Sequence, residues 1–388
     1  MRLDELIKNL KFAVVCIFLV YALWFQYAMY PLDGALAVLA ITMLILEILS
    51  LKRLTYYRPL GFVFVFMALA AIFGIPFAKY RSLTIDAFRG ILGLMIPMVS
   101  IFSSIDYDKE RLKKLFIVIC IVISALSISL LVKGTASATG ALIISDLNSN
   151  AYSAFIFLGV VATLYLLGGS NNRIFTALLY AVFVLECSAQ VMAASRRGII
   201  VLAFMLSTFI HSLLTIKYKR KFGHKLVTIL IASEVISIIL SQLNSDSSLV
   251  LVQRLMGGET HGDLMRAKYQ AVAWEQFLRS PFWGNGLAAV QGEMGVYSHS
   301  LYYELLACTG IFGVLVLLVP LIRKALFFRM VSNQVEDITV KMESRTMFWS
   351  IIGFFLTGIA VVFIYDVAFY VFIGIYAAYQ GIYLRRNQ

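Results

Sequence analysis

The chain has few charged residues and few of the residues that build disulfide frameworks or metal centres. Only 14% of its 388 residues are Asp, Glu, Lys or Arg, against about 25% in an ordinary soluble domain. This scarcity of charge excludes a water-soluble globular domain. The chain also has only four histidines and four cysteines. All four cysteines fall within apolar runs, and we expect them to be small packing residues without a disulfide or metal role, at Cys16, Cys120, Cys187 and Cys308.

Apolar residues make up 61% of the chain and gather in long runs. A helix needs about 20 mostly apolar residues to cross a bilayer. The first run follows a polar start and has no small-residue cleavage site, so we interpret it as a retained helix and not as a signal peptide. The sequence predicts an all-α polytopic membrane protein with about twelve transmembrane helices, near 11–30, 32–50, 59–78, 83–103, 112–132, 149–168, 174–194, 198–216, 225–243, 299–322, 347–364 and 366–384.

Basic residues outnumber acidic ones by 33 to 21 and give a formal net charge of +12. Most of them lie in every second connection between the apolar runs, so this excess indicates membrane topology and not nucleic-acid binding. Cytoplasmic loops carry the excess of Lys and Arg, which predicts that both termini lie in the cytoplasm. An even number of spans agrees with this prediction.

Some basic residues remain in the short loops assigned to the outer face. The connection between spans seven and eight is little more than Ser195-Arg196-Arg197-Gly198. These arginines either snorkel to lipid phosphates or clamp a phosphate or diphosphate ligand. Lys79, Arg81 and Lys133 also lie outside. We expect these three to be solvated or snorkelling, with steering of an anionic sugar or lipid headgroup as the alternative.

One long hydrophilic segment, 244–298, connects spans nine and ten on the outer side. A helix beginning near Asp263 carries an apolar stripe, which predicts that it lies on the membrane surface or caps a cavity. It should end before Ser280-Pro281, because the residue ahead of a proline avoids helical angles. The turn Trp283-Gly284-Asn285-Gly286-Leu287 follows, and its glycines permit a tight path. The stripe comprises Met265, Tyr269, Val272, Ala273 and Phe277.

Span ten is expected to begin at His299, close to the outer face. At 3.6 residues per turn, one helix face carries His299, Tyr303, Leu306, Gly310 and Gly313. The glycines would let a neighbouring helix approach and fix the position of His299. A histidine can accept a proton from a hydroxyl near neutral pH. A purely structural histidine is the alternative.

Three segments, in this order, resemble the O-antigen ligase and polysaccharide polymerase superfamily of bacterial envelope glycosyltransferases. They are the turn at Arg196-Arg197, the Arg266 helix leading into Ser280-Pro281-Phe282-Trp283-Gly284-Asn285-Gly286, and His299-Ser300 followed by nine residues and Gly310-Ile311-Phe312-Gly313. Asn148 and Asn150 also resemble an asparagine common at the start of span six. The resemblance covers about 145–315. It departs from the usual pattern in the doubled arginine and in Ser300, where asparagine is commoner.

The resemblance implies a metal-independent, inverting glycosyltransferase that needs no cofactor. Its donor would be an oligosaccharide linked to undecaprenyl diphosphate. Carried over by position, the catalytic residues would be His299, at the acceptor hydroxyl, and Arg197 and Arg266, at the diphosphate. Which arginine of the pair acts stays open. The substrate-binding residues would be Arg196, Arg254, Asn148, Asn285, Tyr303 and Glu304. The outer face also lacks a dense His/Asp/Glu cluster or an Asp-x-Asp pair in the sequence, which disfavours a metal-dependent enzyme using a nucleotide sugar.

The expected regions are N-terminal transmembrane helices at 1–140, a catalytic region at 141–325 that includes the outer loop, and C-terminal helices at 326–388. The resemblance places the protein in the bacterial cytoplasmic membrane with its active site on the extracytoplasmic face. The lipid bilayer, a flippase and a chain-length regulator of the same pathway would be its partners.

Two alternatives remain open at this stage. Within the enzyme class, a polymerase would join repeat units of O-antigen, capsule or exopolysaccharide, whereas a ligase would transfer the glycan to lipid A-core in lipopolysaccharide. The residues of the His299 and Trp283 segments resemble polysaccharide polymerases more than ligases, which favours the polymerase. From another class, a transporter of lipid-linked oligosaccharide or another solute is suggested by ionisable residues within spans. No repeat between the halves supports it. These residues are Glu47, Asp86, Arg89, Glu186 and Glu234, with Asp86 and Arg89 expected as an intrahelical pair facing the bundle interior.

Overall fold

The computed structural model describes residues 3–29, 32, 34–50, 54–136, 142–144, 149–193, 196–217 and 261–386. Within these ranges the chain is almost entirely helical, and its strands are the antiparallel pair β1 (Thr135–Ala136) and β2 (Leu142–Ile143). Nine of the described helical segments are long and apolar enough to cross a membrane. The protein is therefore an all-α polytopic membrane protein, as the sequence predicts.

The described helices follow the apolar runs. The helix α1 (Leu3–Val20) continues through the π-helical turn η1 (Tyr21–Phe25) into α2 (Gln26–Ala28). The other elements are α3 (Ala35–Leu49), η2 (Leu54–Leu60), α4 (Gly61–Leu69), η3 (Ala70–Gly74), α5 (Ile75–Phe77), α6 (Arg81–Ile105), α7 (Lys109–Lys133), α8 (Ser149–Gly169), α9 (Arg173–Met192), α10 (Arg196–Ser212), η4 (Leu213–Lys217), α13 (His261–Arg279), α14 (Ala289–Met294), α15 (Leu301–Gln334), α16 (Ile338–Gly358), η6 (Phe363–Tyr365) and α17 (Val367–Arg386).

Three of the twelve expected spans do not appear among these nine segments. The expected span 32–50 is the helix α3, whose 15 residues reach about 22 Å at 1.5 Å per residue, short of the hydrocarbon core. The expected span 347–364 lies in α16, which begins earlier, at Ile338, where the Asp337 carboxylate accepts the amide hydrogen of Thr339 at 2.8 Å and caps the helix. Its first turns therefore carry Lys341, Glu343 and Arg345, and the helix is not apolar enough to count among the nine. The expected span 225–243 lies outside the described residues.

The helix α8 lies at the centre of the bundle. Within the apolar stretch of α8, 94% of the residues are buried, against 28% in the next helix, α9. Helices α7, α9, α10 and α16 pack around it. Because α8 is apolar on every side, it has no polar face that water or lipid headgroups would solvate. By contrast, α9 turns large apolar side chains outward, as a lipid-facing helix does, at Ile174, Leu178 and Val184.

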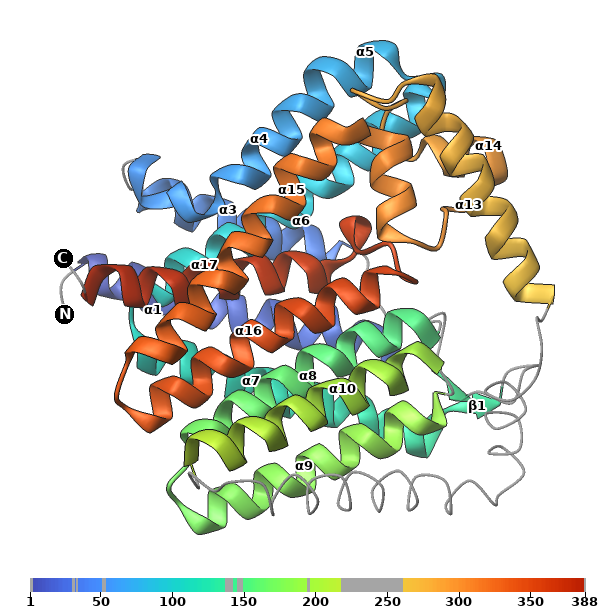
Figure 1. Ribbon diagram of the computed structural model, residues 1–388. Coiled ribbons are helices and arrows are strands. Elements are labelled where there is room, and N and C mark those ends of the chain that lie inside the picture. Colours follow the sequence, from blue (N-terminus) through green and yellow to red (C-terminus); the bar gives the residue numbers. More distant parts are fainter. Residues whose placement is uncertain are drawn as a thin grey trace.

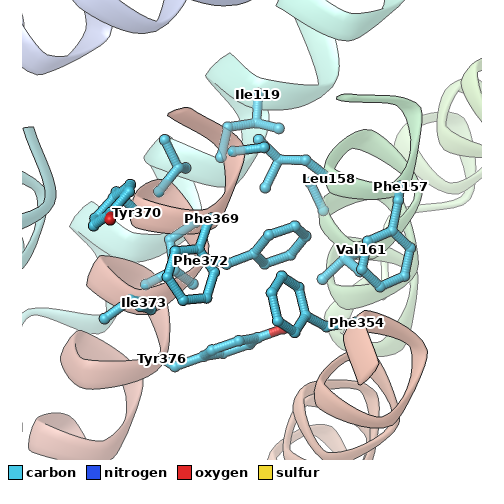
Figure 2. Close-up of a cluster of buried hydrophobic side chains, with 14 of the residues drawn as sticks. Ile119, Phe157, Leu158, Val161, Phe354, Phe369, Tyr370, Phe372, Ile373 and Tyr376 are labelled. Atoms are coloured by element: carbon cyan, nitrogen blue, oxygen red, sulfur yellow. The ribbon is translucent and has the colours of Figure 1, made fainter. Parts of the chain in front are cut away.

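Aromatic rings fill the space between α8, α16 and α17. Figure 2 shows Phe157 of α8, Phe354 of α16 and Phe372 of α17 grouped together. The ring centroids of Phe157 and Phe372 lie 5.3 Å apart, and those of Phe354 and Phe369 lie 5.3 Å apart in a stacked pair. Such pairs contribute about 0.5–1.5 kcal/mol each beyond the area that they bury. This cluster joins the C-terminal helices to the centre of the bundle.

The two ends of the bundle differ in what they carry. Figure 1 shows the start of α1 and the end of α17 together at one end, called here the terminal end. The opposite end, called the loop end, carries α13, α14 and β1. The segments that the sequence assigns to the outer face therefore gather at the end away from the termini.

The ionisable residues expected within spans have partners that give them structural roles. Glu47 pairs with Lys11 at 2.6 Å, and the buried Glu186 accepts a hydrogen bond from the Thr163 hydroxyl at 3.1 Å. Asp86 and Arg89 do form an ion pair, at 3.7 Å, but their side chains are 69% and 75% exposed. The expectation that this pair faces the bundle interior is wrong, because the pair lies near the start of α6, ahead of the stretch from Ile91 onward that holds nearly all of its buried residues. Glu234 lies outside the described residues.

The four cysteines are free, and Cys120 and Cys308 are buried. Cys120 and Cys187 pack with the hydrophobic core, as expected, whereas the Cys308 thiol lies against the Glu304 carboxylate.

Candidate functional site

The helix α13 covers the loop end. It packs on α15 and α14, and its Ala273 joins Val290 and Ala307 in a small buried cluster, with Tyr303 packed against it. It ends at Arg279, directly before Ser280-Pro281, as predicted. The expected helix is therefore present, whereas its position on the membrane surface or over a cavity stays a prediction. Tyr303, expected to bind substrate, is half-buried in this packing.

A break in α15 receives the turn that follows α13. Gly310 has a left-handed φ of +62° inside the helix. The freed amides of Ile311 and Phe312 donate to the carbonyl oxygens of Pro281 and Phe282, at 2.9 and 3.3 Å. A Cβ on Gly310 would lie 2.3 Å from the Phe282 oxygen. Gly310 thus admits this turn and not a neighbouring helix, and the expected continuous face from His299 to Gly313 is interrupted.

Asn285 ties the same turn to both flanking helices. Its side-chain amide donates to the carbonyl oxygens of Gln276 in α13 and Ala307 in α15, at 2.7 and 3.0 Å. Gly284 before it has a φ of +73°, and a Cβ there would lie 2.3 Å from the backbone of Cys308. The sequence assigns Asn285 to substrate binding, whereas the structure engages its amide hydrogens with backbone oxygens.

His299 lies at the start of α15 in an unusual backbone conformation. Its φ is +57°, and the helix itself begins two residues later, at Leu301. A non-glycine residue in this conformation costs about 1–3 kcal/mol and persists only where the surrounding structure holds it. The flanking Ser298 and Ser300 are both buried, and the Ser298 hydroxyl donates to the Ser300 carbonyl oxygen at 2.9 Å. The two serines therefore hold the backbone on either side of His299.

Glu304 of α15 holds the segment from Ser298 to Ser300 through the backbone of Ser298. It is fully buried, and its carboxylate accepts the Ser298 amide hydrogen at 2.8 Å. The Cys308 thiol donates to the same carboxylate at 3.5 Å. The sequence assigns Glu304 to substrate binding. Its burial and its bond to the Ser298 backbone instead fit a positioning role, one turn below His299.

Two tyrosines flank the His299 imidazole. The ring centroid of Tyr297 lies 4.8 Å from that of His299, and that of Tyr269 in α13 lies 5.8 Å away. Arg266 precedes Tyr269 by three residues, so the two lie on adjacent turns of one helix side, and Arg266 is half-buried. The structure thus brings the Arg266 side of α13 to His299.

The start of α10 lies at the same end of the bundle. Gly198 packs so closely that a Cβ would lie 2.0 Å from the Gln190 amide nitrogen. Thr357 of α16 lines the same small cavity as Gly198 and Gln190. Its neighbour Gly358 would place a Cβ 3.1 Å from Leu301. The end of α16 therefore lies between the start of α10 and the start of α15.

The structure does not describe the side chains of the remaining expected site residues. Asn148 and Arg254 fall outside the described residues, and for Arg196 and Arg197 only the helical backbone is described. The sequence signal for the two tyrosines around His299 was incomplete. Tyr269 was placed on the apolar stripe, and Tyr297 stands two residues before His299, where a bend in the chain brings neighbouring rings together.

Several polar residues at the loop end clamp α14 in place. Glu293 accepts hydrogen bonds from the Gln276 amide at 3.0 Å and from Lys79 at 3.4 Å, and Arg279 lies 4.0 Å away. Lys79, whose expected role was solvation or steering, thus pairs across the loop end. Lys133 donates to the Ala28 carbonyl oxygen at 3.4 Å.

This clamp predicts a pH dependence. The Gln276 amide, Lys79 and Arg279 hold the pKa of Glu293 below its ordinary value. A lowered folded-state pKa gives stabilisation that is present above the unfolded value of about 4.3 and is lost as the pH falls through the folded pKa. We expect the hydrogen-exchange protection factors of α13 and α14, which are corrected for the intrinsic exchange rate at each pH, to be high near neutral pH and to fall under acidic conditions. Glu293→Gln should exchange faster at neutral pH, with a weaker pH response, whereas Glu336→Gln, an exposed residue outside the clamp, should behave as the parent protein does.

Metal ligands do not gather at this site. Among the described residues, no three His, Cys, Asp or Glu side chains come together in a way that would hold a metal ion. The residues that do gather are a histidine, an arginine helix and aromatic rings. This set can accept a proton, stabilise an anion and stack against a sugar.

The comparisons with known proteins do not assign the chain to a family. No family model matches the chain, and no curated protein matches it. The chain is similar to one from a solved peptidoglycan synthase complex, described as structural coordination of polymerization and crosslinking by that complex. Their TM-score is 0.48 with 14% sequence identity, over 84% of this chain and 97% of that chain. A likeness of this size decides neither the fold nor the chemistry of this chain.

Proposed function

We propose that the protein is a membrane glycosyltransferase. It would transfer an oligosaccharide from undecaprenyl diphosphate to an acceptor sugar, polymerising repeat units of O-antigen, capsule or exopolysaccharide. The observation that carries the proposal is the approach of the Arg266 side of α13 to His299, with the Tyr269 and His299 rings 5.8 Å apart. The resemblance of these segments to the O-antigen ligase and polymerase superfamily supports the same reading.

In the proposed reaction, His299 accepts the proton of the acceptor hydroxyl. The hydroxyl oxygen attacks the anomeric carbon of the donor from the face opposite the diphosphate. The bond between that carbon and the diphosphate oxygen breaks, and the electron pair leaves with undecaprenyl diphosphate. The product is therefore inverted at this carbon.

The arginines would stabilise the leaving group. Negative charge builds on the diphosphate as its bond breaks, and a guanidinium group can bind two of its oxygens at once. We assign this role to Arg266 and to Arg196 or Arg197 at the start of α10. Stabilising the developing charge is often the largest catalytic contribution.

The proposal places the terminal end in the bacterial cytoplasm and the loop end outside. The excess of basic residues in the connections near the termini supports this orientation. A donor with a prenyl tail would reach the loop end through the membrane plane, and no nucleotide sugar would be needed outside the cell.

The purified protein, supplied with undecaprenyl-diphosphate-linked repeat units, tests the proposal directly. We expect a ladder of glycan lengths to form without any lipopolysaccharide core. Transfer only onto lipid A-core would identify a ligase instead. Movement of the lipid-linked substrate across vesicles without a change in glycan length would identify a transporter.

The same assay tests for metal dependence. Because the proposed reaction uses arginines where other glycosyltransferases use a cation, EDTA should leave the rate of ladder formation unchanged. A loss of activity on chelation that added Mg²⁺ or Mn²⁺ restores would contradict the proposed chemistry.

A further inference from the structure

Two cavities of similar size open at the terminal end. One, of about 740 Å³, lies among α1, α3 and α6 and includes Lys8, Lys11 and Arg111 in its lining. The other, of about 700 Å³, lies among η2, α4, α15 and α17 and includes Arg58, Arg323 and Lys324. We call the second the cationic cavity. Each cavity therefore has three basic residues in its wall. The two cavities differ in whether carboxylates neutralise these positive charges.

The basic residues of the first cavity are paired with carboxylates. Lys8 pairs with Asp106 and Lys11 pairs with Glu47, each at 2.6 Å. Arg111 lies 3.5 Å from a carboxylate oxygen of Asp108. Protein groups thus neutralise the positive charge there.

The basic residues of the cationic cavity have no such balance. In the part of the chain that the structure describes, no carboxylate pairs with Arg58, Arg323 or Lys324. Lys324 is only 4% exposed. Its ammonium group donates to the neutral Gln380 side chain and lies 5.8 Å from the Phe62 ring centroid. The exposed guanidinium groups of Arg58 and Arg323 stay charged in the wall of the same cavity, so the cavity favours an anion from outside the chain.

The walls indicate which anion fits. Two arginines can each offer paired N–H donors, the geometry that phosphate oxygens match, and a lysine adds a point charge. Beside them stand apolar side chains from three elements, Phe62, Pro320 and Leu384, and Leu384 is 45% exposed. A charged pocket with an apolar rim at one end of a membrane bundle fits a lipid headgroup with its acyl chain alongside.

We propose that the cationic cavity binds the phosphate headgroup of an anionic phospholipid in the leaflet at the terminal end. In the orientation given above this is the cytoplasmic leaflet, whose anionic lipids attract basic clusters. The site is distinct from the loop end and does not depend on the glycosyl-transfer proposal. It gives the terminal end a specific lipid contact in addition to a general excess of positive charge.

The test compares two double variants of the full chain. Arg58→Ala/Arg323→Ala removes two exposed cations of the cavity. Lys113→Ala/Lys114→Ala removes two exposed cations of α7 outside the cavity. Both would be measured by native mass spectrometry and by titration with short-chain phosphatidylglycerol, phosphatidylcholine and inorganic pyrophosphate in detergent.

We expect the parent protein to retain phosphatidylglycerol in preference to phosphatidylcholine. The cavity variant should bind phosphatidylglycerol at least about tenfold more weakly, because charge-assisted hydrogen bonds are lost, whereas the α7 variant should match the parent. Equal weakening in both variants, or no preference for phosphatidylglycerol, would overturn the proposal. Pyrophosphate binding with the same variant dependence but without phosphatidylglycerol binding would also overturn the lipid assignment, since it would identify a soluble phosphate ligand.

Discussion

Ladder formation should fall by about 10²–10⁴-fold in His299→Ala, the range that a positioned general base contributes. The Tyr297 and Tyr269 rings hold the imidazole at the loop end, and the proposed reaction needs a group there that accepts a proton near neutral pH. The measurement is the rate of glycan extension by protein reconstituted from a folded, monodisperse preparation. His211→Ala is the matched control, because His211 is exposed on α10.

Arg266→Ala should lose about 10²–10³-fold in the same assay, the effect of removing one donor that stabilises developing charge. Lys268→Ala, two residues away and exposed on the same helix, should retain the parent rate. If His299→Ala or Arg266→Ala polymerises at nearly the parent rate, that residue has no part in the reaction. Equal losses in the controls would instead point to general damage to the loop end.

Gly310→Ala should strongly destabilise the protein. A Cβ at this position combines a left-handed φ of +62° with a contact of 2.3 Å to the Phe282 oxygen. Backbone strain of about 1–3 kcal/mol and overpacking of about 1–3 kcal/mol together predict a loss of about 2–6 kcal/mol. The measurement is the thermal unfolding midpoint in detergent, together with the rate of ladder formation, because His299 lies just before the same helix.

Gly295→Ala separates the two contributions. Gly295 has a φ of +75°, but a Cβ there meets nothing within 4 Å. It should therefore show the conformational cost alone and a clearly smaller fall in the unfolding midpoint than Gly310→Ala. Equal effects of the two substitutions would mean that the docked turn at Pro281 and Phe282 contributes nothing to stability.

Long apolar runs and a proline made much of the fold predictable. Runs of about 20 apolar residues locate most of the spans, and Pro281 locates the end of α13. The sequence did not reveal which side of α6 faces inward, so Asp86 and Arg89 were assigned to the interior when they are exposed. The buried residues of α6 gather from Ile91 onward, and the spacing of an ion pair near its start does not show which side of the helix the bundle covers.

For the candidate site, the sequence indicates which segments come together better than it indicates what each residue contacts. The helix that carries Arg266 does reach His299, through the ring of Tyr269. The roles of Asn285 and Glu304 depend on partners in the folded chain, the Ala307 carbonyl oxygen and the Ser298 amide. The break at Gly310 likewise depends on a turn about thirty residues earlier docking into α15, and a local pattern does not show this.

The enclosure of α8 implies an order of assembly during synthesis. Of the helices around it, α7 precedes it, α9 and α10 follow soon, and α16 comes nearly 170 residues after its end. Until α16 is made, the face that α8 will turn toward Phe354 must be covered by lipid or by the insertion machinery. The side chains of this face, Phe157 and Val161 among them, are apolar and therefore compatible with lipid. A polar substitution on this face would therefore impair insertion before it could affect the finished protein.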